Sequence, residues 1–153
     1  MGYTTEFEGK FKTDKPVDIE TYLLIKGLSE TRRMARRIKG YGIEGEFYVD
    51  SRENFGQNHT PDIIDYNRPP CTQPGLWCKW TILEDKQTIC WDGAEKFYGY
   101  VEWLQYLIDV ILEPRGYIVS GSVKWQGEES DDVGKIIVKK NKIKTKKGFL
   151  FFK

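Results

Sequence analysis

Four arginines lie close together early in the chain and could bind an anion. Arg32 and Arg36 are four residues apart, and so are Arg33 and Arg37. On a helix this spacing makes each pair neighbours, and neighbouring guanidinium groups repel each other unless a phosphate or a carboxylate lies between them. Arginine suits either anion because its planar guanidinium can donate two parallel hydrogen bonds. The alternative is a solvated helix end, where the helix dipole alone favours cations.

A second group of candidate binding residues lies in the proline-rich segment DYNRPPCTQPGLWCKW, residues 65–80. Its three prolines restrict the residues before them to extended backbone, so the segment is stiff and loses little entropy on binding. Tyr66 and Trp77 could stack on a planar ring, and the amides of Asn67 and Gln73 could read its polar edges. The alternative is that the tryptophans only pack and the prolines only shape a crossover.

We expect the arginines and the proline-rich segment to meet at one pocket for an anionic, aromatic ligand such as a nucleotide. In this pocket Arg32, Arg36 and Arg68 hold phosphate groups. Each base stacked on an aromatic ring contributes about 1–3 kcal/mol, so two such contacts would give useful affinity. The predicted ligand-binding residues are Arg32, Arg33, Arg36, Tyr66, Asn67, Arg68, Gln73 and Trp77.

Residues with catalytic chemistry are few. His59 is the only histidine, and a thiolate pair of His59 with Cys71 is the least favoured interpretation. Asp92 and Glu95 have the spacing of a capping box at the start of a helix, and acid catalysis by the two is the alternative. The cysteines are too far apart for a zinc half-site. We therefore assign no catalytic residue, no metal and no cofactor, and favour a protein that is not an enzyme.

The composition predicts a single domain over residues 1–153. The chain is 39% apolar and carries a net charge of +1, which argues against a protein that coats nucleic acid with its whole surface. Three cysteines without a signal-peptide core predict free thiols in a reducing cytoplasm. Nothing in the sequence resembles a membrane span.

Hydrophobic periodicity predicts the elements that must position these residues. Alternation predicts strands at 3–12, 43–49, 77–83, 86–91, 117–126 and 135–140, and a further strand in the last segment is left open. Helical spacing predicts helices at about 16–38 and 95–112, separated by a long loop at 50–76. The expected fold is α+β, with a single antiparallel or mixed sheet of about six to seven strands and two helices packed on one face.

Two further patterns bear on the sheet. Gly9, Gly45 and Gly121 each lie at the centre of an apolar strand face, where we expect them to give the helices room to cross. The basic C-terminal segment 139–153 continues a run of lysines without acids. Lysines on an edge strand prevent aggregation, and attraction of nucleic acid is the alternative, which we do not favour.

Several segments resemble a family of small uncharacterised proteins from bacterial and phage genomes. The matching segments are MGYTTEFEG (1–9), ETRRM (30–34), DYNRPP (65–70), QPGLWC (73–78), WDGAEKFY (91–98) and WQGE (125–128). The resemblance implies a viral or mobile-element setting, and hence a protein that sequesters its ligand to counter host defence signalling. The alternatives are a protein–protein inhibitor of a host defence enzyme and, less favoured, an enzyme that acts on nucleotides through Asp92 and Glu95. Homo-oligomer formation stays open.

Overall fold

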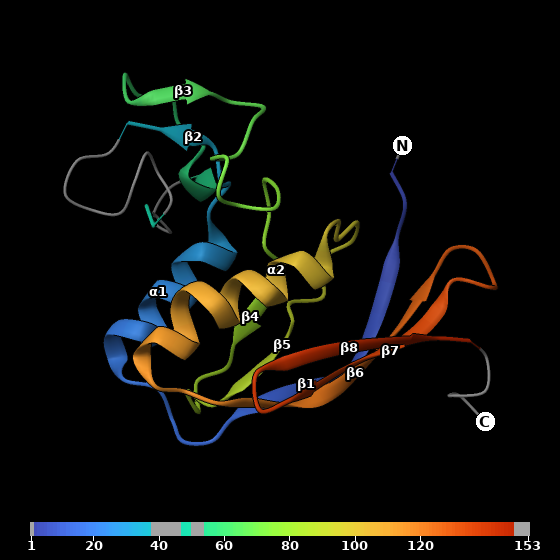
Figure 1. The fold of residues 1–153 in the computed structure, drawn as a ribbon. Helices are drawn as coiled ribbons and strands as arrows, with labels where there is room; N and C mark the ends of the chain where they lie inside the picture. Colours follow the sequence, from blue (N-terminus) through green and yellow to red (C-terminus); the bar gives the residue numbers. More distant parts are fainter. Residues whose placement is uncertain (1, 38–46, 50–53, 149–153) are drawn as a thin grey trace.

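The protein is described by a computed structural model that covers residues 2–37, 47–49 and 54–148. A six-stranded antiparallel sheet has the order β4-β5-β1-β6-β7-β8, and β2 and β3 form a separate small sheet (Figure 1). The strands are β1 (Thr5–Thr13), β2 (Ala35–Arg36), β3 (Ile63–Asp65), β4 (Trp80–Ile82), β5 (Thr88–Trp91), β6 (Val119–Gly127), β7 (Val133–Lys139) and β8 (Lys142–Lys147). This architecture confirms the α+β prediction.

Two α-helices, α1 (Ile19–Glu30) and α2 (Tyr100–Tyr106), both contact the edge strand β4. Helix α2 continues as a π-helical segment, η2 (Leu107–Leu112), and a 3-10 turn, η3 (Glu113–Arg115). Another 3-10 turn, η1 (Asn54–Gly56), precedes β3. The small sheet lies beyond the C-terminal end of α1 (Figure 1). Residues 31–37 and 54–68 therefore form an additional layer at one end of the molecule.

The core lies between the large sheet and the helices. Phe11 of β1 and Trp80 of β4 are fully buried, and their ring centroids lie 5.6 Å apart. The indole Nε1 of Trp80 donates a hydrogen bond of 2.7 Å to the carbonyl of Tyr100. Trp77, three residues earlier, is only half-buried. One tryptophan of the proline-rich segment is therefore a core residue, and the other faces the loop side.

The first helix is shorter than predicted and ends at Glu30. Thr31 is already extended, with φ −122° and ψ 135°. The following backbone amides bond to distant segments: Arg32 N–H donates to the carbonyl of Phe55, and Arg33 N–H donates to the carbonyl of Leu76. The prediction that the arginines lie on the last turns of a helix is therefore wrong, because long-range backbone pairing replaces the helix.

The second helix also begins later than predicted. Asp92 accepts a hydrogen bond from the N–H of Ala94, which makes a local turn in place of a helix cap. The backbone has positive φ at Lys96 (62°) and Gly99 (64°), and a helix cannot run through these residues. The capping-box prediction is therefore wrong. The predicted end is confirmed, since the helical segment runs through Leu112.

The predicted strands match β1, the β4–β5 hairpin, β6 and β7, and β8 is the further strand at the C-terminal side. The predicted strand 43–49 lies largely outside the described residues. The predicted loop 50–76 contains η1 and β3, which the sequence analysis missed. Because β2 and β3 have only two and three residues, neither is long enough to show an alternating pattern.

The mid-strand glycines serve strand pairing and not helix packing. Gly9 and Gly121 have φ values of +121° and +140°. A Cβ atom on Gly9 would lie 2.5 Å from the carbonyl oxygen of Ser122, and one on Gly121 would lie 2.6 Å from that of Lys10. The expected clearance for helices is corrected accordingly: β1 and β6 approach each other closely there. Gly45 lies outside the described residues.

Candidate functional site

The arginines and the proline-rich segment do come together, and Arg32 is the residue that joins them. Its Nε and Nη2 atoms donate hydrogen bonds of 3.2 and 3.1 Å to the carbonyl of Tyr66. Nη2 also lies 3.4 Å from Oδ1 of Asn67. The guanidinium carbon stands 5.9 Å from the ring centre of Trp77, where a cation–π contact is favourable. Arg32 thus remains half-buried between the loop and the tryptophan.

Arg33 and Gln73 are buried, and their side chains form a hydrogen bond with each other. Nε of Arg33 donates a hydrogen bond of 3.2 Å to Oε1 of Gln73, and Nη1 donates to the carbonyl of Tyr48. Nε2 of Gln73 donates to the hydroxyl of Tyr106 on α2 at 3.1 Å. The exposed fractions are 1% for Arg33 and 6% for Gln73. In this arrangement neither side chain can contact a ligand at the surface.

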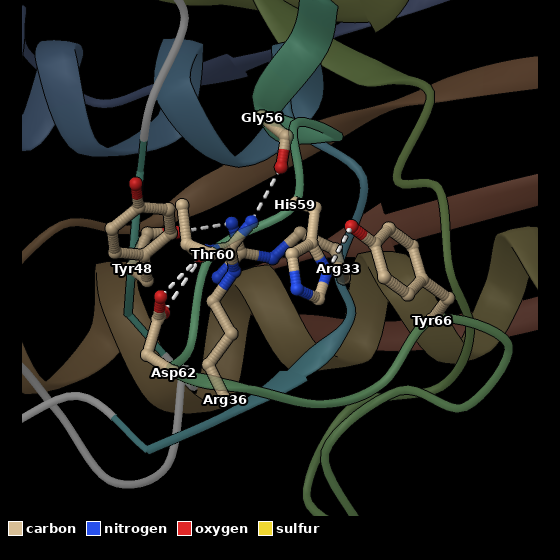
Figure 2. Close-up of polar contacts among 8 residues, drawn as sticks. All are labelled: Arg33, Arg36, Tyr48, Gly56, His59, Thr60, Asp62 and Tyr66. Carbon is tan, nitrogen blue, oxygen red and sulfur yellow. Dashed lines mark hydrogen bonds and ion pairs between the residues drawn. The ribbon is translucent and has the colours of Figure 1, made fainter.

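Arg36 is likewise enclosed (Figure 2). Its Nη1 lies 3.0 Å from Oδ2 of Asp62, Nη2 donates to the carbonyl of Gly56, and the guanidinium stands 4.3 Å from the ring centre of Tyr48. Burial raises the pKa of Asp62, but hydrogen bonds from Thr60 and Arg36 outweigh it and leave that pKa below its ordinary value. This cluster fastens β2 to the turn before β3.

The remaining residues of the predicted set are more accessible. The ring of Tyr66 stacks on His59 at 6.0 Å between centroids, and its hydroxyl lies 3.2 Å from Nδ1 of His59 (Figure 2). Asn67 is exposed. The side chain of Arg68 is 78% exposed, with Nε 3.9 Å from Oδ2 of Asp65. An exposed ion pair at this distance contributes little stabilisation, so the guanidinium of Arg68 can bind another anion.

A cavity of about 820 Å³ opens beside Trp77, between the C-terminal half of α1 and the β4–β5 hairpin. We call it the aromatic groove. Its lining residues are Lys26, Ser29, Glu30, Phe55, Trp77, Lys79, Thr81, Leu83, Cys90, Trp91, Asp92, Gly93 and Ala94. Trp77 is the one residue of the predicted set among them. The sequence analysis missed the others because they come from four segments that the fold brings together.

Charged groups of both signs line the aromatic groove. The Nζ atom of Lys26 lies 3.8 Å from the carboxylate of Glu30. Burial lowers the pKa of Lys79, and burial raises the pKa of Asp92 although the Ala94 N–H and the charge of Lys79 oppose this. Burial and the negative charges of Asp92 and Asp85 raise the pKa of Cys90, and the positive charges of Lys10 and Lys26 offset this only in part. Two lysines, Lys26 and Lys79, and two acids, Glu30 and Asp92, thus line the groove. Nζ of Lys79 donates a hydrogen bond to the carbonyl of Glu95.

Asp92 and Glu95 do not meet in the groove. Asp92 lines it, whereas Glu95 lies outside the lining and is close to Nζ of Lys96, at 3.6 Å. A single carboxylate with a raised pKa can accept hydrogen bonds from ligand hydroxyls. The two carboxylates therefore do not line one site.

Among the described residues, no three His, Cys, Asp or Glu side chains gather in a way that could hold a metal ion. No helix within the described part of the chain is long and apolar enough to cross a membrane. Comparison of the chain with protein-family models, with curated proteins and with solved structures finds no match.

Proposed function

We propose that this protein is a non-enzymatic binding protein that sequesters an anionic, nucleotide-like ligand in the aromatic groove. The observation that carries the proposal is that three aromatic residues and two lysines line one cavity: Phe55, Trp77, Trp91, Lys26 and Lys79. An aromatic ring offers a stacking surface to any base, at about 1–3 kcal/mol each. An ammonium group forms strong hydrogen bonds with phosphate oxygens.

The proposed site also includes accessible residues of the predicted set that lie outside the groove lining. The guanidinium of Arg32 lies over Trp77, and the exposed side chains of Asn67 and Arg68 follow from the same loop. In the proposed complex a base lies against Trp77, while Arg32 and Arg68 hold the phosphate groups. The buried members of the predicted set instead hold the loop in place.

The proposal includes a biological setting. The resemblance of segments such as DYNRPP (65–70) to proteins of phage and bacterial genomes supports a viral or mobile-element protein. Sequestering a nucleotide signal in the host cytoplasm would counter host defence signalling without any chemical step. A binding protein of this kind needs affinity and abundance, and it needs no catalytic residue.

A protein–protein inhibitor of a host defence enzyme is the second candidate, and one observation favours it. Phe55 and Ile64 are 60% and 45% exposed, and they lie on the same additional layer as Arg68. Aromatic residues and arginine are the residues that most often dominate a protein interface. Such a surface would retain a host protein, whereas a sequestering protein retains a small molecule.

Isothermal titration calorimetry with a panel of mononucleotides and cyclic oligonucleotides tests the proposal. We expect saturable heat with at least one of them, and a loss of affinity of roughly 10-fold or more for Trp77→Ala, because one stacking contact is removed. Tyr98→Ala is the matched control, since Tyr98 is 57% exposed and lies outside the groove. No heat with any member of the panel rejects the proposal. A host protein captured from lysate in its place supports the inhibitor.

A further inference from the structure

One side of the large sheet carries lysine on four successive strands. Residues that lie opposite each other in neighbouring strands point to the same side. Lys124 of β6 lies opposite Lys135 of β7, which lies opposite Lys146 of β8. Lys10 of β1 lies opposite Ser122 of β6, and Ser122 points to the same side as Lys124 because the two are two residues apart. We call this side the lysine face; its lysines are Lys10, Lys12, Lys124, Lys135, Lys139, Lys142, Lys144 and Lys146.

The lysine face is the solvent side of these strands. Alternate residues of β6 and β7, among them Val123, Ile136 and Val138, are buried in the core on the opposite side. The outward positions of β1, β6, β7 and β8 include eight lysines but only two acids, Glu6 and Glu8. Because the whole chain has a net charge of only +1, its positive charge is concentrated on this one face.

Protection of a sheet edge does not explain this arrangement. Lysines that prevent strand-on-strand aggregation belong on an edge strand, and of the strands concerned only β8 lies at an edge. Lys10, Lys12 and Lys124 lie on β1 and β6, which are interior strands. Edge protection therefore accounts for the lysines of β8 and not for those of β1 and β6.

The residues between the lysines indicate which polyanion fits. Ser120, Ser122 and Ile137 occupy outward positions, and no aromatic ring lies among the outward residues of β1, β6, β7 and β8. Bases of a single strand would have no ring on which to stack. Ammonium and hydroxyl groups contact phosphates, which carry no sequence information. The four strands together span about 14 Å across the sheet. The major groove of a DNA duplex is ~12 Å wide, so lysines on the outer strands can reach the phosphate backbones on its two sides.

We propose that the lysine face binds the phosphate backbone of a nucleic acid duplex, without preference for sequence. The surface is separate from the aromatic groove, because none of its lysines lines that cavity. The duplex-binding proposal can therefore be tested separately from the proposed nucleotide site. It also differs from attraction through the C-terminal segment alone, because lysines of β1 and β6 contribute.

Fluorescence anisotropy with a short labelled duplex, at about 50 mM and about 200 mM KCl, tests the proposal. The test variant is the triple Lys10→Gln/Lys144→Gln/Lys146→Gln, in which all three side chains are exposed. The matched control is Lys15→Gln/Lys96→Gln/Lys147→Gln, which removes the same charge from exposed lysines outside the face. Thermal unfolding verifies that both variants remain folded.

We expect the parent protein to bind a DNA duplex, with weaker binding to single strands. The test variant should lose roughly 10-fold or more in affinity at low salt, and its salt slope should fall by about 3, since each lost phosphate contact lowers the slope by about 1. The control should change the slope by less than about 1. Equal effects of the two variants, absence of duplex binding at low salt, or tighter binding to single strands would overturn the proposal. Tighter binding to vesicles of anionic lipid would identify a membrane surface as the partner instead.

Discussion

Arg33 and Gln73 face each other inside the protein, with Nε of Arg33 donating a hydrogen bond of 3.2 Å to Oε1 of Gln73. Both residues had been predicted to contact a ligand. Nε2 of Gln73 in turn donates a hydrogen bond to the hydroxyl of Tyr106, and this bond ties the proline-rich segment to helix α2. The stiff loop is thus anchored from within, a few residues before Trp77 of the aromatic groove.

Removal of the Gln73 side chain should destabilise the protein. In Gln73→Ala the guanidinium of Arg33 and the hydroxyl of Tyr106 each lose a buried hydrogen-bond partner. We expect the free energy of unfolding to fall by about 1–3 kcal/mol, measured by urea denaturation. Thr72→Ala, at an exposed neighbouring position, should change it by less than about 0.5 kcal/mol. A loss no larger than that of this control would contradict an anchoring role.

Arg36 should matter for stability much more than its neighbour Arg37. Arg36→Ala leaves Asp62 without its ion-pair partner and empties the space beside Tyr48. Because the pair is largely buried, we expect a loss of about 3 kcal/mol in the free energy of unfolding. The exposed Arg37→Ala serves as the control and should cost less than about 0.5 kcal/mol. Similar midpoints in guanidinium chloride for the two variants would show that the cluster is not structural.

Gly121 should tolerate alanine less well than Gly116. Both have positive φ, 140° and 86°. A Cβ on Gly121 would lie 2.6 Å from the carbonyl oxygen of Lys10, whereas one on Gly116 would meet nothing within 4 Å. Gly116→Ala should therefore cost only backbone strain, about 1 kcal/mol, and Gly121→Ala at least about 2 kcal/mol more, because β1 and β6 must move apart. Differential scanning calorimetry measures both, and equal losses would refute the close approach.

Asp85 should contribute to the acid sensitivity of the fold. Hydrogen bonds from the Thr88 hydroxyl and from the backbone N–H groups of Gln87 and Thr88 lower the pKa of Asp85 from 3.8 to about 2. The folded pKa is thus below the unfolded one, so the stabilisation is present above about pH 4 and disappears as the pH falls toward 2. Asp85→Asn should lower the Tm at neutral pH, and the difference from the parent should narrow between pH 4 and pH 2. A difference independent of pH would exclude this carboxylate as the cause.

The three cysteines should differ in reactivity. Burial raises the pKa of Cys78 to about 12, so almost no thiolate is present at neutral pH. Cys71 is exposed and Cys90 lines the aromatic groove. With iodoacetamide at about pH 8, mass spectrometry should find Cys71 modified first and Cys78 modified only in denaturant. Occupation of the groove by a ligand should protect Cys90 selectively.

The sequence alone determined the elements whose signal is local. The alternation of β1, with Phe11 inward and Lys12 outward, follows from the period of a strand and needs no knowledge of the partner strand. The same period places Trp80 and Ile82 of β4 in the core and leaves Thr81 between them half-buried. The strand predictions succeeded because a half-buried strand alternates apolar and polar residues, and this alternation can be seen in consecutive residues of the sequence.

Only the tertiary structure decided where α1 ends and what its arginines do. The side-chain partners of Arg33 and Arg36 include Gln73 and Asp62, which lie 40 and 26 residues away in the chain. The lysine face likewise depends on the strand order, which places Lys10 on the same side of the sheet as Lys144. Local propensity is a weak preference per residue, whereas burial of a guanidinium or alignment of charges depends on contacts between distant segments. The order of residues therefore predicted the strands, and the folded packing determined which charges are enclosed and which remain on the surface.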